Sequence, residues 1–204
     1  MNFFEKYRKQ CEKCNRNKKV IIPSNDLKNG IPGKNRIKIL FINERPGPKA
    51  EIVSFENCDP SAKLFKHLFI KTFGINFRKY IFITNAIIWV PTGKRRNYAP
   101  LQKELAQKNN LSILKKQIKL ANPELIVPLG NSALYSIKKT YPESKTLRKY
   151  KLKNNIGTPI KDCSINIFPV YHTSGLAQKT RNKKQQEQDW IKLRFARTVK
   201  LATN

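Results

Sequence analysis

The sequence predicts an α/β fold: a three-layer α/β/α sandwich around a central, mostly parallel sheet of four strands. Four short apolar runs have the length of buried strands. They are separated by segments whose apolar residues recur at helical spacing. Strands that alternate with helices favour a parallel sheet with helices on both faces, which indicates this fold class. The four runs are Ile37–Ile42, Tyr80–Thr84, Leu125–Leu129 and Ile165–Tyr171.

Four segments are predicted to be helical from the spacing of their apolar residues. Gly74 is a stop signal for the first, and Asn122-Pro123 breaks the second. The last helix is strongly basic, and we expect its inner side to carry Trp190, Leu193, Phe195 and Val199. The four segments are Asp59–Phe73, Gln102–Ala121, Ser132–Thr140 and Lys183–Leu201.

The length of 204 residues suits a single domain with a sizeable core, so we expect one domain over residues 1–204. Residues 1–36 are predicted to form a basic N-terminal helix and a wrapping loop, and residues 183–204 a basic C-terminal helix. Two long basic loops are expected at Pro91–Pro100 and Tyr141–Pro159.

No apolar run reaches the roughly 20 residues that a membrane span needs. The first residues also lack the apolar region of a signal peptide. We therefore expect an intracellular protein, in the cytoplasm or in an organellar (mitochondrial) matrix, that is neither secreted nor bound to a membrane.

The charge of the chain is extreme, with 42 Lys and Arg against 13 Asp and Glu, a net charge of +29. An AT-rich gene would favour lysine, but it would also favour glutamate, and acidic residues are scarce. Phosphate backbones are the natural counterion for such a surface. The charge therefore predicts a nucleic-acid partner.

Polar residues follow the apolar runs at the edge where ligands bind in open α/β sheets. Asn85 offers one acceptor and two donors that match the edge of a flat heterocycle, or it caps a turn. His172 can donate to an oxygen that gains charge as a bond breaks, or it is a surface histidine. Phe55 either stacks on a base or fills the core, and the other histidine, His67, is predicted to be structural.

Two further features of the sequence bear on the site. The Pro46-Gly47 turn lets backbone amides approach a ligand closely. Of the four cysteines, only Cys11 and Cys14 form a local C-x-x-C motif, which supplies half of the ligands that a zinc ion or a cubane cluster needs. Cys58 and Cys163 are predicted to be buried structural thiols.

Six motifs follow one another along the chain between Asn43 and Trp190. They are Asn43-Glu44-Arg45-Pro46-Gly47, Phe55 with Asn57-Cys58-Asp59-Pro60-Ser61-Ala62, Thr84-Asn85 ahead of Pro91, Leu129-Gly130, His172-Thr173-Ser174, and Asp189-Trp190. Together they resemble the uracil-DNA glycosylase superfamily, in particular the bacterial and archaeal branch that carries an iron–sulfur cluster.

The resemblance implies a DNA repair enzyme that excises uracil, or a related deaminated base, from a flipped-out nucleotide. His172 would stabilise charge on the leaving base, Asn85 would read its pairing edge, and Glu44 is the candidate for activating water. The base would be held by Phe55, Pro46, Gly47 and Ser174, with Leu176 as a wedge in the gap. Phosphate contacts are expected from Lys94, Arg95, Arg96 and Arg45.

The chain lacks two of the four cysteines that hold the iron–sulfur cluster in this branch. Cys11 and Cys14 match the first two ligands, but the third and fourth should fall at Trp89 and near Asn110. We therefore expect no cofactor and no metal. The turn also has Asn43 and Arg45 where the family has glycine and a small residue, and Thr173 replaces a proline.

A second hypothesis follows from these departures and from the charge. The chain would be an inactive protein of the same fold that serves as a structural component of a (mito)ribosome or other ribonucleoprotein, with ribosomal RNA and ribosomal proteins as partners. An active enzyme would instead act on DNA as a monomer. Uracil excision distinguishes the two hypotheses.

Overall fold

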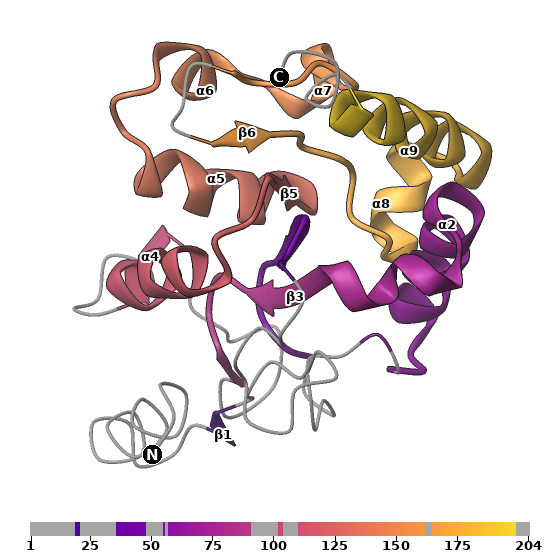
Figure 1. Ribbon diagram of the computed structural model, residues 1–204, viewed down its shortest axis with the longest axis horizontal. Helices are drawn as coiled ribbons and strands as arrows, with labels where there is room; N and C mark the ends of the chain where they lie inside the picture. Colours follow the sequence, from indigo (N-terminus) through magenta and orange to yellow (C-terminus); the bar gives the residue numbers. More distant parts are fainter. Residues whose placement is uncertain are drawn as a thin grey trace.

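The computed structural model describes residues 19–20, 36–47, 55, 57–90, 102–103, 110–161 and 165–198, and structural statements below concern these residues. Figure 1 shows a central sheet with helices on both sides. Its elements in chain order are β1 (Lys19–Val20), β2 (Ile39–Asn43), α2 (Pro60–Phe73), the 3-10 helix η1 (Ile75–Tyr80), β3 (Ile81–Asn85), β4 (Trp89–Val90), α4 (Asn110–Ala121), β5 (Leu125–Pro128), α5 (Gly130–Thr140), α6 (Lys145–Lys149), α7 (Leu152–Asn155), β6 (Asn166–Ile167), α8 (Gly175–Thr180) and α9 (Lys183–Thr198).

The four strands of the main sheet lie in the order β3-β2-β5-β6, and each of the three neighbouring pairs is parallel. The predicted parallel four-stranded sheet is confirmed. All four strands fall within or beside the predicted apolar runs. The last strand is shorter than its run, but a parallel bridge from Leu129 to Val170 extends its pairing with β5.

Side chains alternate between the two faces of the sheet, and each face has its own core. On one face, Phe41, Ile83 and Val170 pack in a cluster with α2 and α9. On the other face, Leu40 and Phe82 pack in a cluster with α4 and α5. Figure 1 shows the same two pairs of helices on opposite sides of the strands, which confirms the three-layer sandwich.

Helix α2 begins and ends where its sequence predicts. The Asp59 carboxylate accepts hydrogen bonds from the backbone N–H groups of Ser61 and Ala62, a typical N-cap. Gly74 ends the helix with φ +76°, a backbone conformation that residues with a Cβ rarely adopt. The Asp59 cap and the Gly74 stop fix where the helix begins and ends in the chain.

Helix α9 packs against α2 through Trp190, which is fully buried. Its indole stacks on Phe41 at 5.5 Å between ring centroids and meets Phe65 edge-on. The prediction that Phe195 lies on the inner side is wrong, because that ring is 63% exposed. The buried face instead continues through Gln186 and Asp189, polar residues that the apolar pattern could not reveal, and Val199 lies outside the described residues.

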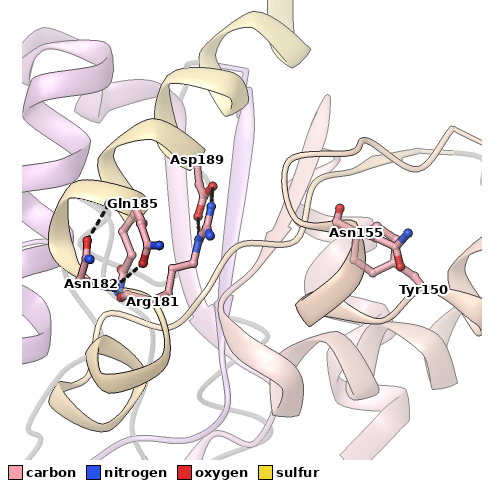
Figure 2. Close-up of polar contacts among 7 residues, drawn as sticks. Tyr150, Asn155, Arg181, Asn182, Gln185 and Asp189 are labelled. Carbon is pink, nitrogen blue, oxygen red and sulfur yellow. Dashed lines mark hydrogen bonds and ion pairs between the residues drawn. The ribbon is translucent and has the colours of Figure 1, made fainter.

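Polar contacts also join α9 to the segment that directly precedes it (Figure 2). The Arg181 guanidinium donates two hydrogen bonds, of 2.7 and 2.6 Å, to the buried carboxylate of Asp189. Asn182 and Gln185 exchange side-chain to backbone hydrogen bonds of 3.0 Å in the manner of a capping box. These contacts fix the direction in which the chain enters α9.

An ion-pair cluster on the surface links α2 to α9. Glu187 accepts from Lys71 Nζ at 2.6 Å and lies 3.1 Å from His67 Nε2. The hydrogen bond from Lys71, followed by that from His67, lowers the pKa of the Glu187 carboxyl below its usual value. His67 thus has the structural place that its helical position predicted.

The connection from α5 to β6 differs from the loop predicted over Tyr141–Pro159. It contains the short helices α6 and α7. Each of them buries one leucine in the core, Leu147 in α6 and Leu152 in α7. The second predicted helix is described at residues 102–103 and as α4 from Asn110. The loop Pro91–Pro100 lies outside the described residues.

Near the N-terminus the structure describes one short strand where a helix and loop were predicted. β1 pairs antiparallel with β4, with Val20 opposite Trp89. The rest of the predicted N-terminal helix and loop, up to residue 35, lies outside the described residues. None of the described helices is both long enough and apolar enough to cross a membrane.

Candidate active site at the carboxyl edge of the sheet

Two carboxamides lie side by side where β2 and β3 end. Asn43 and Asn85 are partners in the parallel register. Both continue the face that carries Phe41 and Ile83, because side chains two residues apart share a face. The two turns beyond are joined by hydrogen bonds from Ala86 N to Asn43 O at 2.8 Å and from Ile87 N to Glu44 O at 3.0 Å.

Asn85 is 3% exposed. Its Nδ2 has no hydrogen-bond partner among the residues that the structure describes. A buried amide donor without an acceptor costs free energy, and such groups call for an explanation. An acceptor on a ligand bound at this edge would satisfy it.

The turn after β2 places charged and backbone groups beside this amide. Glu44 Oε1 accepts from Arg45 Nε at 2.9 Å, and the Arg45 side chain is 10% exposed. Pro46 is buried and Gly47 is exposed. Arg45 was predicted to contact phosphate, and its guanidinium lies against Glu44 in this structure.

His172 follows the bridge between Leu129 and Val170 and is half-buried. Its Nδ1 accepts a hydrogen bond of 3.0 Å from the backbone N–H of Ser174. A ring nitrogen that accepts carries no hydrogen, so in the neutral imidazole the hydrogen sits on Nε2. The local backbone thus prepares His172 as a donor through Nε2.

Gly130 packs directly against this histidine. It has φ +86°, and a Cβ built on it would lie 3.1 Å from the Cβ of His172. Its backbone N–H donates to Val170 O at 2.8 Å. The close approach of these two segments therefore depends on a glycine at this position.

We expect Gly130→Ala to destabilise the fold by about 1–3 kcal/mol and to shift the imidazole proton resonances of His172. Gly74→Ala is the matched control, since Gly74 also has positive φ but no atom within 4 Å of a built Cβ. Thermal unfolding and NMR of the His172 ring measure both effects. Equal ring shifts in the two variants would contradict the assigned contact.

A second contact holds the loop after His172. The hydroxyls of Thr173 and Ser61 are hydrogen-bonded at 2.9 Å, and Thr173 is buried. This bond ties the histidine loop to the start of α2. Sequence reasoning missed this pair, because two hydroxyl residues 112 positions apart give no local signal.

Phe55 lies in the aromatic cluster beneath the same face of the sheet and is 3% exposed. Its ring meets Phe69 and Phe65 edge-on, at 5.1 and 6.3 Å between centroids. Of the two alternatives that the sequence left open, core packing describes this structure. Stacking on a base stays a prediction, and it requires the ring to be uncovered.

The short helix α8 follows the histidine loop. The Ser174 hydroxyl caps it by accepting from Ala177 N at 3.4 Å. Leu176 projects from its first turn and is 78% exposed. Lys94, Arg95 and Arg96, the predicted phosphate contacts, lie outside the described residues.

The strand order places Asn85 and His172 on opposite sides of the candidate site. β2 and β5 separate the strands that precede them, so their backbones lie about 14 Å apart at the usual strand spacing. The carboxyl edge thus carries a buried amide donor after β3 and an imidazole donor beyond β6.

The residues at the expected cluster positions do not fit an iron–sulfur cluster, which is held by cysteine thiolates. Trp89 is an indole buried in β4, and Asn110 is a carboxamide at the start of α4. Among the described residues, no three His, Cys, Asp or Glu side chains group as metal ligands. Cys11 and Cys14 lie outside them.

One cysteine prediction is wrong. Cys58 is exposed rather than buried, because it lies just ahead of the N-cap of α2 at the surface. Cys163 lies outside the described residues.

Comparison with known proteins supports the resemblance seen in the sequence. Residues 32–194 match the family model of the uracil DNA glycosylase superfamily. The chain is 28% identical over 179 residues to a type-4 uracil-DNA glycosylase of Saccharolobus solfataricus, covering 86% of this chain and 80% of that protein. A type-4 uracil-DNA glycosylase of Sulfurisphaera tokodaii is 26% identical over 169 residues, with 81% and 74% covered. The family match spans most of the chain, including both sides of the candidate site, and this chain belongs to the uracil DNA glycosylase superfamily.

Proposed function

We propose that this chain is a uracil-DNA glycosylase that hydrolyses the N-glycosidic bond of a deoxyuridine flipped out of DNA. The observation that carries the proposal is the buried Asn85 amide, whose Nδ2 has no partner among the described residues. The family and the names of both archaeal relatives support the same reaction.

The Asn85 donor accounts for how the enzyme would discriminate uracil from cytosine. Uracil presents a carbonyl oxygen at position 4, which accepts from Nδ2. Cytosine presents an amino group there, so two donors would face each other and the buried amide would stay unpaired. Sites built around a buried polar group discriminate strongly for this reason.

His172 acts on the leaving base. Water attacks C1′ and gives up a proton to Glu44, while the bond from C1′ to the base nitrogen breaks. The electron pair moves onto the ring, where O2 gains negative charge, and the released base then takes up a proton. The hydrogen on Nε2 donates to this oxygen, since Nδ1 is held by Ser174 N–H. A donor fixed before the reaction needs no reorganisation as the charge develops.

The turn after β2 would hold the water and the base. Glu44 Oε1 accepts the hydrogen bond from Arg45 Nε, so we assign the orientation of the attacking water to Oε2. Pro46 and Gly47 follow Glu44 in a turn that is joined to the turn after Asn85 by the hydrogen bond from Ile87 N to Glu44 O. In this role Arg45 tethers the carboxylate.

The remaining contacts are assigned by position. The exposed Leu176 would enter the gap left by the flipped nucleotide, and Ser174 supports it as the cap of α8. Lys94, Arg95 and Arg96 would contact phosphates. We propose that the enzyme acts as a monomer and without a cofactor, and that Phe55 stacks on the base once uncovered.

The test is excision of uracil by the wild type and by Asn85→Ala on single- and double-stranded oligonucleotides. We expect the variant to lose about 10- to 100-fold in single-turnover rate, because one buried hydrogen bond to the base is lost. Asn76→Ala, an exposed amide on η1, is the control and should match the wild type. Equal inactivity of the wild type and Asn85→Ala on both substrates would refute the proposal and favour a nucleic-acid-binding protein without catalysis.

A further inference from the structure

A cationic groove runs along α5 beside the candidate active site. It has a volume of about 420 Å³, and its lining includes Asn131, Ser132, Tyr135, Lys138, Lys151 and Lys153. The lining residues come from the start and middle of α5, from the segment around α7 and from Gln102. None of its described lining residues is acidic.

One end of the groove lies next to the His172 side of the candidate active site. Asn131 and Ser132 directly follow Gly130, whose built Cβ lies 3.1 Å from the Cβ of His172. The groove then follows α5 to Lys138, away from the sheet edge. A polymer with its reacting unit at His172 would therefore meet the groove on one side of that unit.

The positive charge of the groove is not neutralised within the described residues. Lys151 and Lys153 are exposed, and no described carboxylate pairs with either ammonium group. Lys138 donates to the backbone oxygens of Tyr150 and Arg148, which anchors the lysine-bearing segment to α5. Burial lowers the pKa of Lys138, and the nearby charge of Lys151 lowers it further.

An aromatic ring lies on the same wall. Tyr135 is half-buried, and Lys139 Nζ lies 5.4 Å from its ring centroid. Lysines beside an aromatic ring are the combination through which proteins bind single-stranded nucleic acids, by phosphate contacts and base stacking. The groove therefore has the chemistry of a strand-binding surface.

We propose that this groove binds the phosphodiester backbone of the DNA strand that carries the target nucleotide, on one side of that nucleotide. Lys151 and Lys153 contact successive phosphates, and Tyr135 offers a stacking surface for a flanking base. The identity of the strand rests on the proposed glycosylase function, but binding by the groove does not need catalysis.

The experiment measures binding of a uracil-free single-stranded DNA oligonucleotide as a function of salt. The groove variant is Lys151→Gln with Lys153→Gln. The control is Lys115→Gln with Lys119→Gln, two exposed lysines on α4 whose removal lowers the net charge equally. Thermal unfolding verifies that all three proteins are folded.

The groove variant is expected to lower the slope of log K against log salt by about 1.4, from two contacts at about 0.7 each for a single strand. The control is expected to keep the wild-type slope. Equal slopes in the wild type and the groove variant, or equal losses in both variants, would overturn the proposal. Tighter binding of an RNA oligonucleotide of the same sequence would overturn the assignment to DNA.

A second measurement locates the contact. Uracil placed at either end of an oligonucleotide has flanking strand on one side only, and the groove variant should be impaired on one of the two substrates. Equal excision of both substrates by the groove variant would contradict one-sided contact. If no protein excised uracil, the proposed function would fail, while the salt slopes would still decide the role of the groove.

Discussion

His172→Ala is expected to lower the single-turnover rate of uracil excision by about 10²- to 10³-fold, with little change in DNA affinity. The reason is that Nε2 donates to the oxygen that gains charge in the transition state, and losing one such donor costs about this much. The hydrogen bond from Ser174 N–H to Nδ1 places the hydrogen on Nε2. Rapid-mixing kinetics at saturating enzyme measure the rate.

The chain offers a matched control in its other histidine. His67 lies on α2, with its side chain 44% exposed and paired with Glu187. His67→Ala should therefore excise uracil at the wild-type rate. A similar loss in both variants, or a His172→Ala enzyme with full activity, would remove His172 from the proposed mechanism.

Arg181→Ala is expected to reduce the free energy of unfolding by about 3–5 kcal/mol. The substitution leaves the Asp189 carboxylate buried at 1% exposure without the guanidinium that donates two hydrogen bonds to it. Arg181→Lys should recover part of the loss, because it restores the charge but not the two-pronged geometry. Urea unfolding monitored by circular dichroism measures the change.

Arg36→Ala provides the comparison, since Arg36 is exposed and meets Glu124 at 3.5 Å. Exposed ion pairs contribute about 1 kcal/mol or less, so this variant should unfold almost as the wild type does. Arg181→Ala with a comparably small effect would show that the pair beside Trp190 does not hold α9 in place.

The parallel four-stranded sheet was predictable from the sequence, because its buried strands are short apolar runs bounded by polar residues, whereas the strand order β3-β2-β5-β6 was not predicted. The places of Asn85 at the end of β3 and of His172 beyond the bridge at Val170 were predicted in this way. The inner face of α9 was predicted only in part. Periodicity favoured Phe195, whereas the fold buries Asp189 and satisfies it with Arg181, a pairing that has no hydrophobic signature.

The supports of the site were not predictable for a different reason. The Ser61–Thr173 hydrogen bond and the packing of Gly130 on His172 join segments far apart in the chain. Cys58 was expected to be buried because cysteines usually are, but its place ahead of α2 is set by the Asp59 cap. Phe55 illustrates the limit of sequence reasoning, since a phenyl ring can stack on a base or pack in the core.

The most direct measurement of the central claim follows both products of the wild type on an oligonucleotide with a single uracil. Alkali cleavage quantifies abasic sites, and mass spectrometry identifies the released base. The proposed function predicts free uracil and abasic strand in equal amounts, with no release from the same sequence carrying cytosine. An intact strand that stays bound to the protein would contradict it.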